Sequence, residues 1–276
     1  MSTSTASPAN GTAAATAAAL RPPGSIAVRH PADAEYLFRL GDTCLILGQR
    51  LGEWCGHAPI LEEDIALANM ALDMIGQTRA LLTRAGQLEG QGFDEDQLAF
   101  LRDERDYRNL TMVELPRGDF AFTVLRNLFV STWLKLHWER LIDSSDTELA
   151  GIAGKAVKEA RYHQQHAADW VVRLADGTEE SGRRMQAALA DLWRYVPEMF
   201  TADAVDAAAG ALGPTRAALS EPWHAEIASV FADAGLTAPA DSPFRSTATQ
   251  GIHTEHMGRI LAEMQYLQRA YPGGAW

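Results

Sequence analysis

Apolar residues recur at helical spacing along several segments of about 20 residues or more, and this periodicity limits the possible folds more than any other feature. In the first of these segments the apolar positions follow one another at steps of three and four residues: Tyr36, Leu40, Cys44, Leu47 and Leu51. We find no convincing strand run, no repeat of fixed period and no linker between domains. The pattern therefore predicts an all-α chain.

The same periodicity places the helices along the chain. Five long helices are predicted over residues 34–55, 61–87, 120–142, 147–174 and 249–270, and two shorter ones over 181–195 and 222–234. Asp119 and Asp146 are of the residue types that cap helix N-termini. Long helices in one chain favour a bundle with extra short helices, and the long connection before the third suits a ferritin-like crossover. Other all-α architectures stay open on pattern alone.

Residues 1–27 differ from the rest of the chain, being rich in Ala, Ser and Thr without acidic residues. We expect a disordered N-terminal extension there, with a cleaved targeting segment as the alternative. Residues 28–276 are expected to form a single domain, for which 47% hydrophobic residues supply an ample core. Cys44 and Cys55 lie too far apart on one predicted helix for a disulfide, and Cys55 is interpreted as a core thiol.

Net charge and hydropathy exclude several classes of partner. The formal net charge is −12 at pH 7, whereas nucleic acids and anionic membranes attract basic surfaces. No apolar run approaches the roughly 18–20 residues of a membrane span. Two separated thiols fit a reducing compartment. We therefore expect a cytoplasmic protein that binds neither nucleic acid nor membrane.

A helical bundle can hold two iron ions, but the required residues are specific. Each of two helices must supply a Glu, and each of the other two a Glu-x-x-His motif. The chain contains one formal match, Glu221 to His224, with Pro222 inside it in a short late segment. Because a helix terminus is a poor place for ligands in a bundle core, we attribute this match to chance.

The long helices keep only fragments of such a site. Asp73 is followed three residues later by Gly76, which has no side chain to offer. Glu159 has its histidine, His163, at i+4 instead of i+3. The positions interpreted as vestigial metal-site positions are Gln49, Asp73, Glu159 and His163. We expect no metal in this chain, and a Glu159–His163 pair in a polar layer of the core, with Arg79 or Lys155 nearby.

Other catalytic constellations are absent or weaker. The sequence has no G-x-S-x-G, P-loop or G-x-G-x-x-G motif, so we assign no catalytic residue. His253 and His256 lie on one helix face, but a zinc site of the H-E-x-x-H type is missing. We interpret this segment as a capped helix start with solvated or interface histidines.

Several long stretches resemble one family closely. Residues 43–59 read TCLILGQRLGEWCGHAP, and further matching stretches are LAN at 67–69, RDER at 102–105, KEARYH at 158–163, GIHTEH at 251–256 and LAEMQYLQR at 261–269. Over about residues 33–276 the sequence resembles the structural subunits of phenylacetyl-CoA 1,2-epoxidase, the ring-hydroxylating complex of phenylacetate degradation. The resemblance implies a ferritin-like fold and a structural, non-catalytic role.

The resemblance also implies partners. A homologous catalytic subunit binds the di-iron centre and phenylacetyl-CoA, and a small bridging subunit joins the complex. A reductase with FAD and an iron–sulfur cluster draws electrons from NADPH. The complex inserts one atom of O₂ into the aromatic ring and gives a ring 1,2-epoxide. No cofactor is expected in this chain itself.

Some residues are implied to lie near the CoA ligand. The substrate-binding candidates are Asp106, Tyr107, Arg108 and Asn109, and secondly Ala207, Ala208 and Ala209. An Arg and an Asn could contact phosphate or amide groups. Two alternatives stay open: a stand-alone di-iron oxygenase with atypical ligands (Asp73, Glu159 and His163), and a CoA-thioester binding module that acts without an iron partner.

Overall fold

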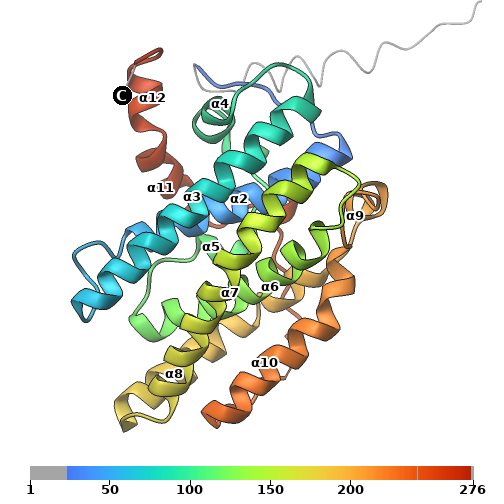
Figure 1. Cartoon of the computed structure of the whole chain (residues 1–276). Helices are drawn as coiled ribbons and strands as arrows, with labels where there is room; N and C mark the ends of the chain where they lie inside the picture. Colours follow the sequence, from blue (N-terminus) through green and yellow to red (C-terminus); the bar gives the residue numbers. More distant parts are fainter. Residues whose placement is uncertain (1–23, 241, 275–276) are drawn as a thin grey trace, which may run out of the picture.

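The computed structural model describes residues 24–240 and 242–274, and this part of the chain contains helices and no strands (Figure 1). Four long helices form the bundle: α2 (Ala32–Gly52), α3 (Leu61–Glu89), α6 (Phe120–Leu141) and α7 (Thr147–Ala175). The predicted fold class, an all-α ferritin-like bundle with extra short helices, is confirmed.

The bundle consists of two antiparallel hairpins. Helix α2 packs along α3, α6 packs along α7, and α3 also contacts α7. Gly41 and Gly48 face α3, where a Cβ atom on Gly48 would lie 3.2 Å from the Cδ1 atom of Ile75 and 3.3 Å from the Cβ atom of Met74. These glycines let the two backbones of the first hairpin approach closely.

A long crossover joins the hairpins between α3 and α6 (Figure 1). It contains α4 (Glu95–Phe100), the 3₁₀ helix η1 (Glu104–Asp106) and α5 (Thr111–Glu114). Arg102 in this segment is fully buried and pairs with Asp42 of α2, with the Arg102 Nη1 atom 3.0 Å from Oδ2 of Asp42. The Arg102–Asp42 pair therefore ties the crossover to the first hairpin.

The predicted caps of α6 and α7 are confirmed. The Asp119 carboxylate accepts a hydrogen bond from the Phe122 amide at 2.9 Å, and that of Asp146 accepts from the Glu148 and Leu149 amides at 3.0 and 3.1 Å. The prediction for Cys55 is wrong. Helix α2 ends at Gly52, so Cys55 lies in the following turn and is exposed, whereas Cys44 is buried.

Shorter helices cover the second hairpin. They are α8 (Glu179–Trp193), η2 (Val196–Phe200), α9 (Ala204–Ala208), η3 (Arg216–Leu219) and α10 (Ser220–Ala234). Helices α8 and α10 pack on α6 and α7, and α9 packs on α2. Phe129 of α6 lies edge-on to Trp193 and Trp223, with ring centroids 5.9 and 5.4 Å away, so aromatic packing fixes these covering helices.

The prediction of one long helix over residues 249–270 is wrong. The first part of this range is mostly a loop, and the second part consists of two helices. The structure has η4 (Ala248–Gln250), then α11 (Glu255–Met264) and α12 (Tyr266–Ala270). Gly251 adopts φ 77°, which a continuous helix does not allow. The buried Glu198 carboxylate also accepts hydrogen bonds from the Thr249 amide at 3.2 Å and the Ser246 hydroxyl at 2.9 Å. This carboxylate holds the segment as a loop.

The start of the chain is described only from Gly24, so residues 1–23 of the predicted extension lie outside the described residues. Residues 24–27 run along the crossover: the Ile26 amide donates to the Leu101 carbonyl at 3.0 Å, and Gln91 donates to the Ala27 carbonyl at 2.8 Å. The domain boundary at residue 28 stays a prediction. None of the helices in the described ranges has the length and apolar character that crossing a membrane requires.

Candidate functional site

The centre of the bundle, where a di-iron protein carries its ligands, is mainly apolar here. A cavity of about 10 Å³ is lined by residues from all four long helices: Leu47, Leu51, Met70, Met74, Asn127, Ser131, Leu134 and His163. That volume holds about one water molecule at most. The layer contributes one imidazole and no carboxylate, which is the wrong ligand chemistry for a pair of iron ions.

His163 is the residue lining this cavity whose side chain is of a kind that commonly binds metals. It forms a hydrogen bond with a residue of a neighbouring helix. The His163 Nε2 atom lies 3.0 Å from Oδ2 of Asp73 on α3. Burial lowers the pKa of the His163 imidazole, and the hydrogen bond to Asp73 offsets this in part. The imidazole is therefore neutral at pH 7 and donates its Nε2 proton to the carboxylate.

Glu159 forms an ion pair with the predicted neighbour Lys155 and a hydrogen bond with a residue of α3 that was not predicted. The Nε2 atom of Gln77 donates to its carboxylate at 2.9 Å, and the predicted neighbour Lys155 lies 3.8 Å away. Arg79, the other predicted neighbour, instead pairs with Glu95 at 3.0 Å. The hydrogen bonds of Glu159 and His163 thus go to α3 and not to each other, because both side chains point across the helix interface.

Three such contacts form what we call the α3–α7 seam: Asp73–His163, Gln77–Glu159 and Glu63–His166, the last at 2.8 Å. Of the four positions interpreted as vestigial, Asp73 and His163 are in contact with each other, and Glu159 lies in the next contact. Gln49, half-buried on α2, takes no part in the seam. Within residues 24–240 and 242–274, no three or more His, Cys, Asp or Glu side chains are grouped to hold a metal ion.

The predicted CoA-contacting segment, residues 106–109, lies largely inside the fold. Tyr107 is fully buried, and its hydroxyl donates to the Ala99 carbonyl at 2.5 Å and accepts from Gln265 at 2.8 Å. The Arg102 guanidinium lies 4.3 Å from the centre of the Tyr107 ring. Asp106 is also buried, close to His30.

The other two residues of this segment bridge helices. The Asn109 amide donates to Glu114 at 2.9 Å and is buried. The Arg108 Nε donates to Glu35 at 3.2 Å, and its backbone amide donates to Asp42 at 2.8 Å. Arg108 is the most accessible of the four residues. Their role in binding a CoA ligand stays a prediction, and Arg108 is the side chain best placed for it.

The second candidate segment closes α9. Ala207 and Ala208 are exposed, whereas Ala209 is buried at the helix end. Asp206 beside them is buried and binds Arg216, with the carboxylate 2.9 Å from Nη2. The three alanines therefore lie beside an ion pair that stabilises the end of α9. Their predicted contact with the ligand also stays a prediction.

The interpretation of the segment that contains His253 and His256 is half right. The Thr254 hydroxyl accepts from the His256 amide at 3.3 Å, so the helix start is capped as predicted. The His253 side chain is not solvated but fully buried, with Nδ1 2.6 Å from Oε1 of Glu114. Glu114 also accepts from the backbone amide and the hydroxyl of Thr254, each at 2.8 Å. The Glu114 carboxylate therefore holds His253 and Thr254 against the core.

Sequence reasoning did not locate the exposed apolar face that the structure has on α3, which we call the outer stripe. Its members are Leu61, Ile65, Leu72 and Ile75, with exposed fractions of 71%, 55%, 69% and 37%. Their spacings of four, seven and three residues keep them on one side of the helix. The periodicity of α3 could have revealed this stripe, since its apolar residues cover two faces and only one can line the core.

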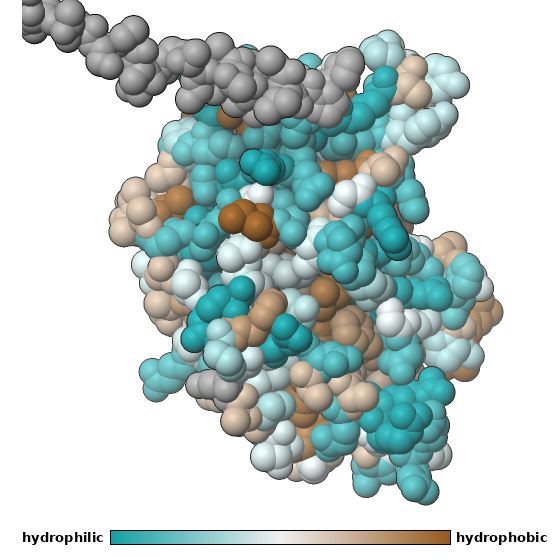
Figure 2. Space-filling view, turned by 180° about the vertical axis from the view of Figure 1, so that it is seen from behind, coloured by the Kyte–Doolittle hydropathy of each residue, from teal (hydrophilic) through white to brown (hydrophobic). Residues whose placement is uncertain are grey.

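The face of the molecule seen from behind is drawn in Figure 2. Figure 2 shows that face as largely hydrophilic, with small hydrophobic spots separated by polar residues. Scattered apolar residues of this kind are ordinary on protein surfaces, whereas an aligned row on one helix is a candidate interaction site.

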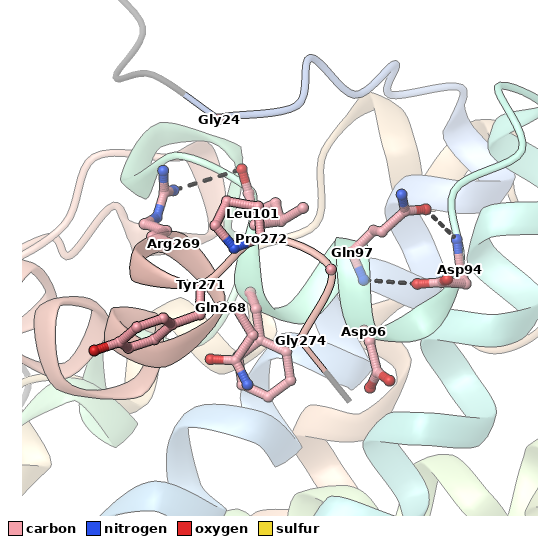
Figure 3. Close-up of a pocket in the computed structure, with 12 residues that line it drawn as sticks. Gly24, Asp94, Asp96, Gln97, Leu101, Gln268, Arg269, Tyr271, Pro272 and Gly274 are labelled. Atoms are coloured by element: carbon pink, nitrogen blue, oxygen red, sulfur yellow. Dashed lines mark hydrogen bonds between the residues drawn. The ribbon is translucent and has the colours of Figure 1, made fainter. Parts of the chain in front are cut away.

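A cavity of about 530 Å³ lies between α4 and the C-terminal segment (Figure 3). Its polar side chains already have structural partners. Asp94 and Gln97 form the capping box of α4, and the Arg269 Nη2 atom lies 3.5 Å from the Leu101 carbonyl. The cavity borders Gly24 and Gly274, where the described ranges end, and we assign it no role.

Known proteins resemble the chain over most of its length. Residues 24–276 match the family model described as phenylacetic acid catabolic protein. The chain is 49% identical over 245 residues to a subunit of the 1,2-phenylacetyl-CoA epoxidase of Escherichia coli (strain K12). This match covers 87% of the present chain and 98% of the relative.

Proposed function

Because the chain belongs to the phenylacetic acid catabolic protein family, we propose that it is the structural, non-catalytic subunit of a multicomponent phenylacetyl-CoA epoxidase. In this role it supports a homologous catalytic subunit that holds the di-iron centre. The complex epoxidises the aromatic ring of phenylacetyl-CoA in aerobic phenylacetate degradation.

The composition of the bundle centre carries the proposal. Leu47, Leu51, Met70 and Met74 occupy the layer in which two Glu-x-x-His motifs and two further Glu residues would lie. The nearby polar groups, including Asp73 and His163, already pair across the α3–α7 seam. These contacts support a subunit whose central layer serves stability while the chemistry takes place on a partner.

The outer stripe of α3 supports a docking role. An apolar row with spacings of four, seven and three residues suits a helix of the catalytic subunit lying along α3. Burying such a row removes a large apolar area from water, and large aliphatic side chains at its centre, such as Leu72, contribute most. We assign the outer stripe to the contact with the catalytic subunit.

The remaining components belong to the proposed complex and not to this chain. A small bridging subunit would hold the assembly together. A reductase with FAD and an iron–sulfur cluster would pass electrons from NADPH to the di-iron subunit. Among the candidate ligand contacts, Arg108 has the charge and accessibility to meet a CoA phosphate.

Iron analysis of the purified chain tests the proposal. The chain alone should bind less than about 0.1 iron per molecule and show no oxygen-dependent turnover of phenylacetyl-CoA. Adding the catalytic subunit and the reductase should give epoxide formation that depends on both ferritin-like chains. About two irons per chain with turnover in the absence of the partner would contradict it and favour the stand-alone oxygenase.

The docking face is tested by charge insertion. Ile65→Glu combined with Leu72→Glu should weaken binding to the catalytic subunit by at least tenfold, because two carboxylates would be buried in an apolar contact. The matched control is Ile252→Glu, at a site with an exposed fraction of 65% away from the outer stripe. Equal affinity of the double variant and the control, measured by titration calorimetry, would show that another face binds the partner.

A kinetic experiment tests the ligand contact. In the assembled complex, Arg108→Gln should raise KM for phenylacetyl-CoA several-fold and leave kcat unchanged, because a contact to a distant phosphate stabilises ground and transition states equally. Arg105→Gln, which changes an exposed neighbour, is the control. An unchanged KM in Arg108→Gln would remove this residue from the ligand site.

A further inference from the structure

A second apolar feature lies beside the outer stripe, where the ends of four helices meet. A cavity of about 310 Å³, which we call the end pocket, is bordered by the N-cap of α3, the start of α6, the end of α7 and the start of α8 (Figure 1). Its volume is at the lower limit for a drug-sized ligand, roughly 300 Å³. The apolar residues that line it are Pro59, Ile60, Phe120, Ala121, Trp170 and Leu174.

Aromatic rings contribute to the wall of the end pocket. Phe120 lies edge-on to Trp54 and to Trp170, with ring centroids 5.8 and 5.0 Å away. Phe120 and Trp170 both line the pocket, and both are half-buried. Aromatic rings favour edge-to-face contacts with one another, so these two rings offer a favourable surface to a further ring.

The polar groups around the end pocket already have partners within the chain. The Thr178 hydroxyl accepts a hydrogen bond from the Ser181 amide at 3.1 Å, and the Asp119 carboxylate accepts from an amide of α6 at 2.9 Å. The Glu180 carboxylate lies 2.7 Å from Nε of Arg184. A small-molecule site uses a few polar groups to orient its ligand, and here those groups are engaged. The pocket therefore suits an apolar side chain better than a polar small molecule.

The end pocket continues the outer stripe. Ile60, with an exposed fraction of 48%, lines the pocket, and the next residue, Leu61, is the first member of the stripe. Beyond Ile75, at the other end of the stripe, Arg79 pairs with Glu95 and the surface is charged. Four partly exposed aliphatic side chains cannot cover the roughly 800 Å² that each partner of a stable complex buries. A contact along the stripe must therefore extend further, and the pocket is the apolar surface that adjoins it.

We propose that the end pocket receives one large aromatic side chain of the catalytic subunit. This inference rests on the proposed function, in which that subunit lies along α3. An aromatic side chain inserted into a pocket commonly contributes more to the stability of a complex than the contacts around it. The ring would pack against Phe120 and Trp170, and the ion pair between Glu180 and Arg184 would lie beside it at the polar rim.

A variant that fills the end pocket tests this inference. Ala121→Met places a larger side chain in the pocket, so it should weaken the binding of the catalytic subunit to the full chain at least tenfold in titration calorimetry. Ala187→Met makes the same exchange at an exposed position of α8 outside the pocket, and it should bind like the wild type. Thermal unfolding of both variants checks that they are folded. Equal affinities of the two variants would overturn the proposal.

Fluorine NMR on the unchanged chain does not depend on how well a variant folds. After labelling with fluorotryptophan, the signal of Trp170, assigned through Trp170→Phe, should shift when the catalytic subunit is added. The signal of Trp138, which is fully buried in α6, should stay in place. A Trp170 signal that is unchanged in the complex would overturn this inference and leave the proposed function intact, whereas the absence of any complex would overturn both. A Trp170 shift that depends on the concentration of the chain alone would assign the pocket to a second copy and contradict the proposal.

Discussion

At the scale of single residues, burial and the hydrogen bond to Asp73 have opposite effects on the pKa of His163. Burial favours the neutral imidazole, and Asp73 favours the charged form, with burial the stronger effect. The folded-state pKa of His163 therefore lies below its unfolded value of about 6.5. Because the unfolded chain binds the proton more readily, the contribution of His163 to stability is present above about pH 6.5 and is lost as the pH falls below it.

This sign gives a prediction for the pH dependence of unfolding. His163→Gln keeps a donor for Asp73 and removes the titration, so its free energy of unfolding should fall less than that of the wild type between pH 7 and pH 5. His137, whose pKa burial lowers to about 3, should leave part of the slope in place. Urea titrations at several pH values measure both slopes, with His57→Gln as the exposed control. An identical slope in His163→Gln would contradict the assignment.

The pair between Arg102 and Asp42 allows a second prediction at this scale. Asp42→Ala should destabilise the fold by about 3–5 kcal/mol, because it removes the carboxylate paired with the buried Arg102 charge. Asp42→Leu combined with Arg102→Met should recover much of this loss, since both charges of the buried pair are then removed. Urea unfolding measures both variants. A double variant less stable than Asp42→Ala would show that the pair contributes more than charge compensation.

At the scale of the helices, local signals predicted most of the structure. The positions of α2, α3, α6 and α7 follow from apolar periodicity and from caps such as Asp119 and Asp146. The C-terminal helix was predicted too long because its first part is held as a loop by Glu198, far away in the sequence, whose carboxylate accepts a hydrogen bond from the Thr249 amide. Periodicity contains no information about such a distant hydrogen bond.

The contribution of Asp146 to stability as the N-cap of α7 can be measured separately from the contribution of its ion pair with Arg84. Asp146→Ala should destabilise the chain by about 1–2 kcal/mol, because two amides at the start of α7 lose their acceptor. Asp146→Ser keeps an acceptor but removes the 2.8 Å contact with Nε of Arg84, and should cost less. Thermal unfolding of the two variants measures the difference. Equal losses would assign the effect to the Arg84 contact alone.

At the scale of the whole molecule, the sequence predicted the candidate site only in part. The absence of two Glu-x-x-His motifs was visible in the sequence, and so was the spacing of four residues between Glu159 and His163. Their partners Gln77 and Asp73 were not, because these contacts depend on how α3 and α7 are rotated against each other. The outer stripe was missed for a similar reason: the period of α3 fits two apolar faces, and only packing selects the inner one.

An exposed row of this kind should affect the isolated chain. Without a partner, the chain should self-associate as its concentration rises, because the outer stripe leaves large aliphatic side chains in water. Ile65→Glu combined with Leu72→Glu should keep it monomeric. Light scattering over a range of concentrations measures the mean mass. A wild-type chain that stays monomeric at about 100 μM would contradict this prediction.

The apolar centre of the bundle also restricts how such a chain can change over evolutionary time. Leu47, Leu51, Met70 and Met74 fill the layer and leave a cavity of about 10 Å³. One carboxylate introduced there would be buried without metal or partner and would destabilise the fold by several kcal/mol. Four or more substitutions would have to occur together before an iron pair could compensate. Each single step is therefore disfavoured, so a pair of iron ions could be introduced into this layer only by several substitutions made together.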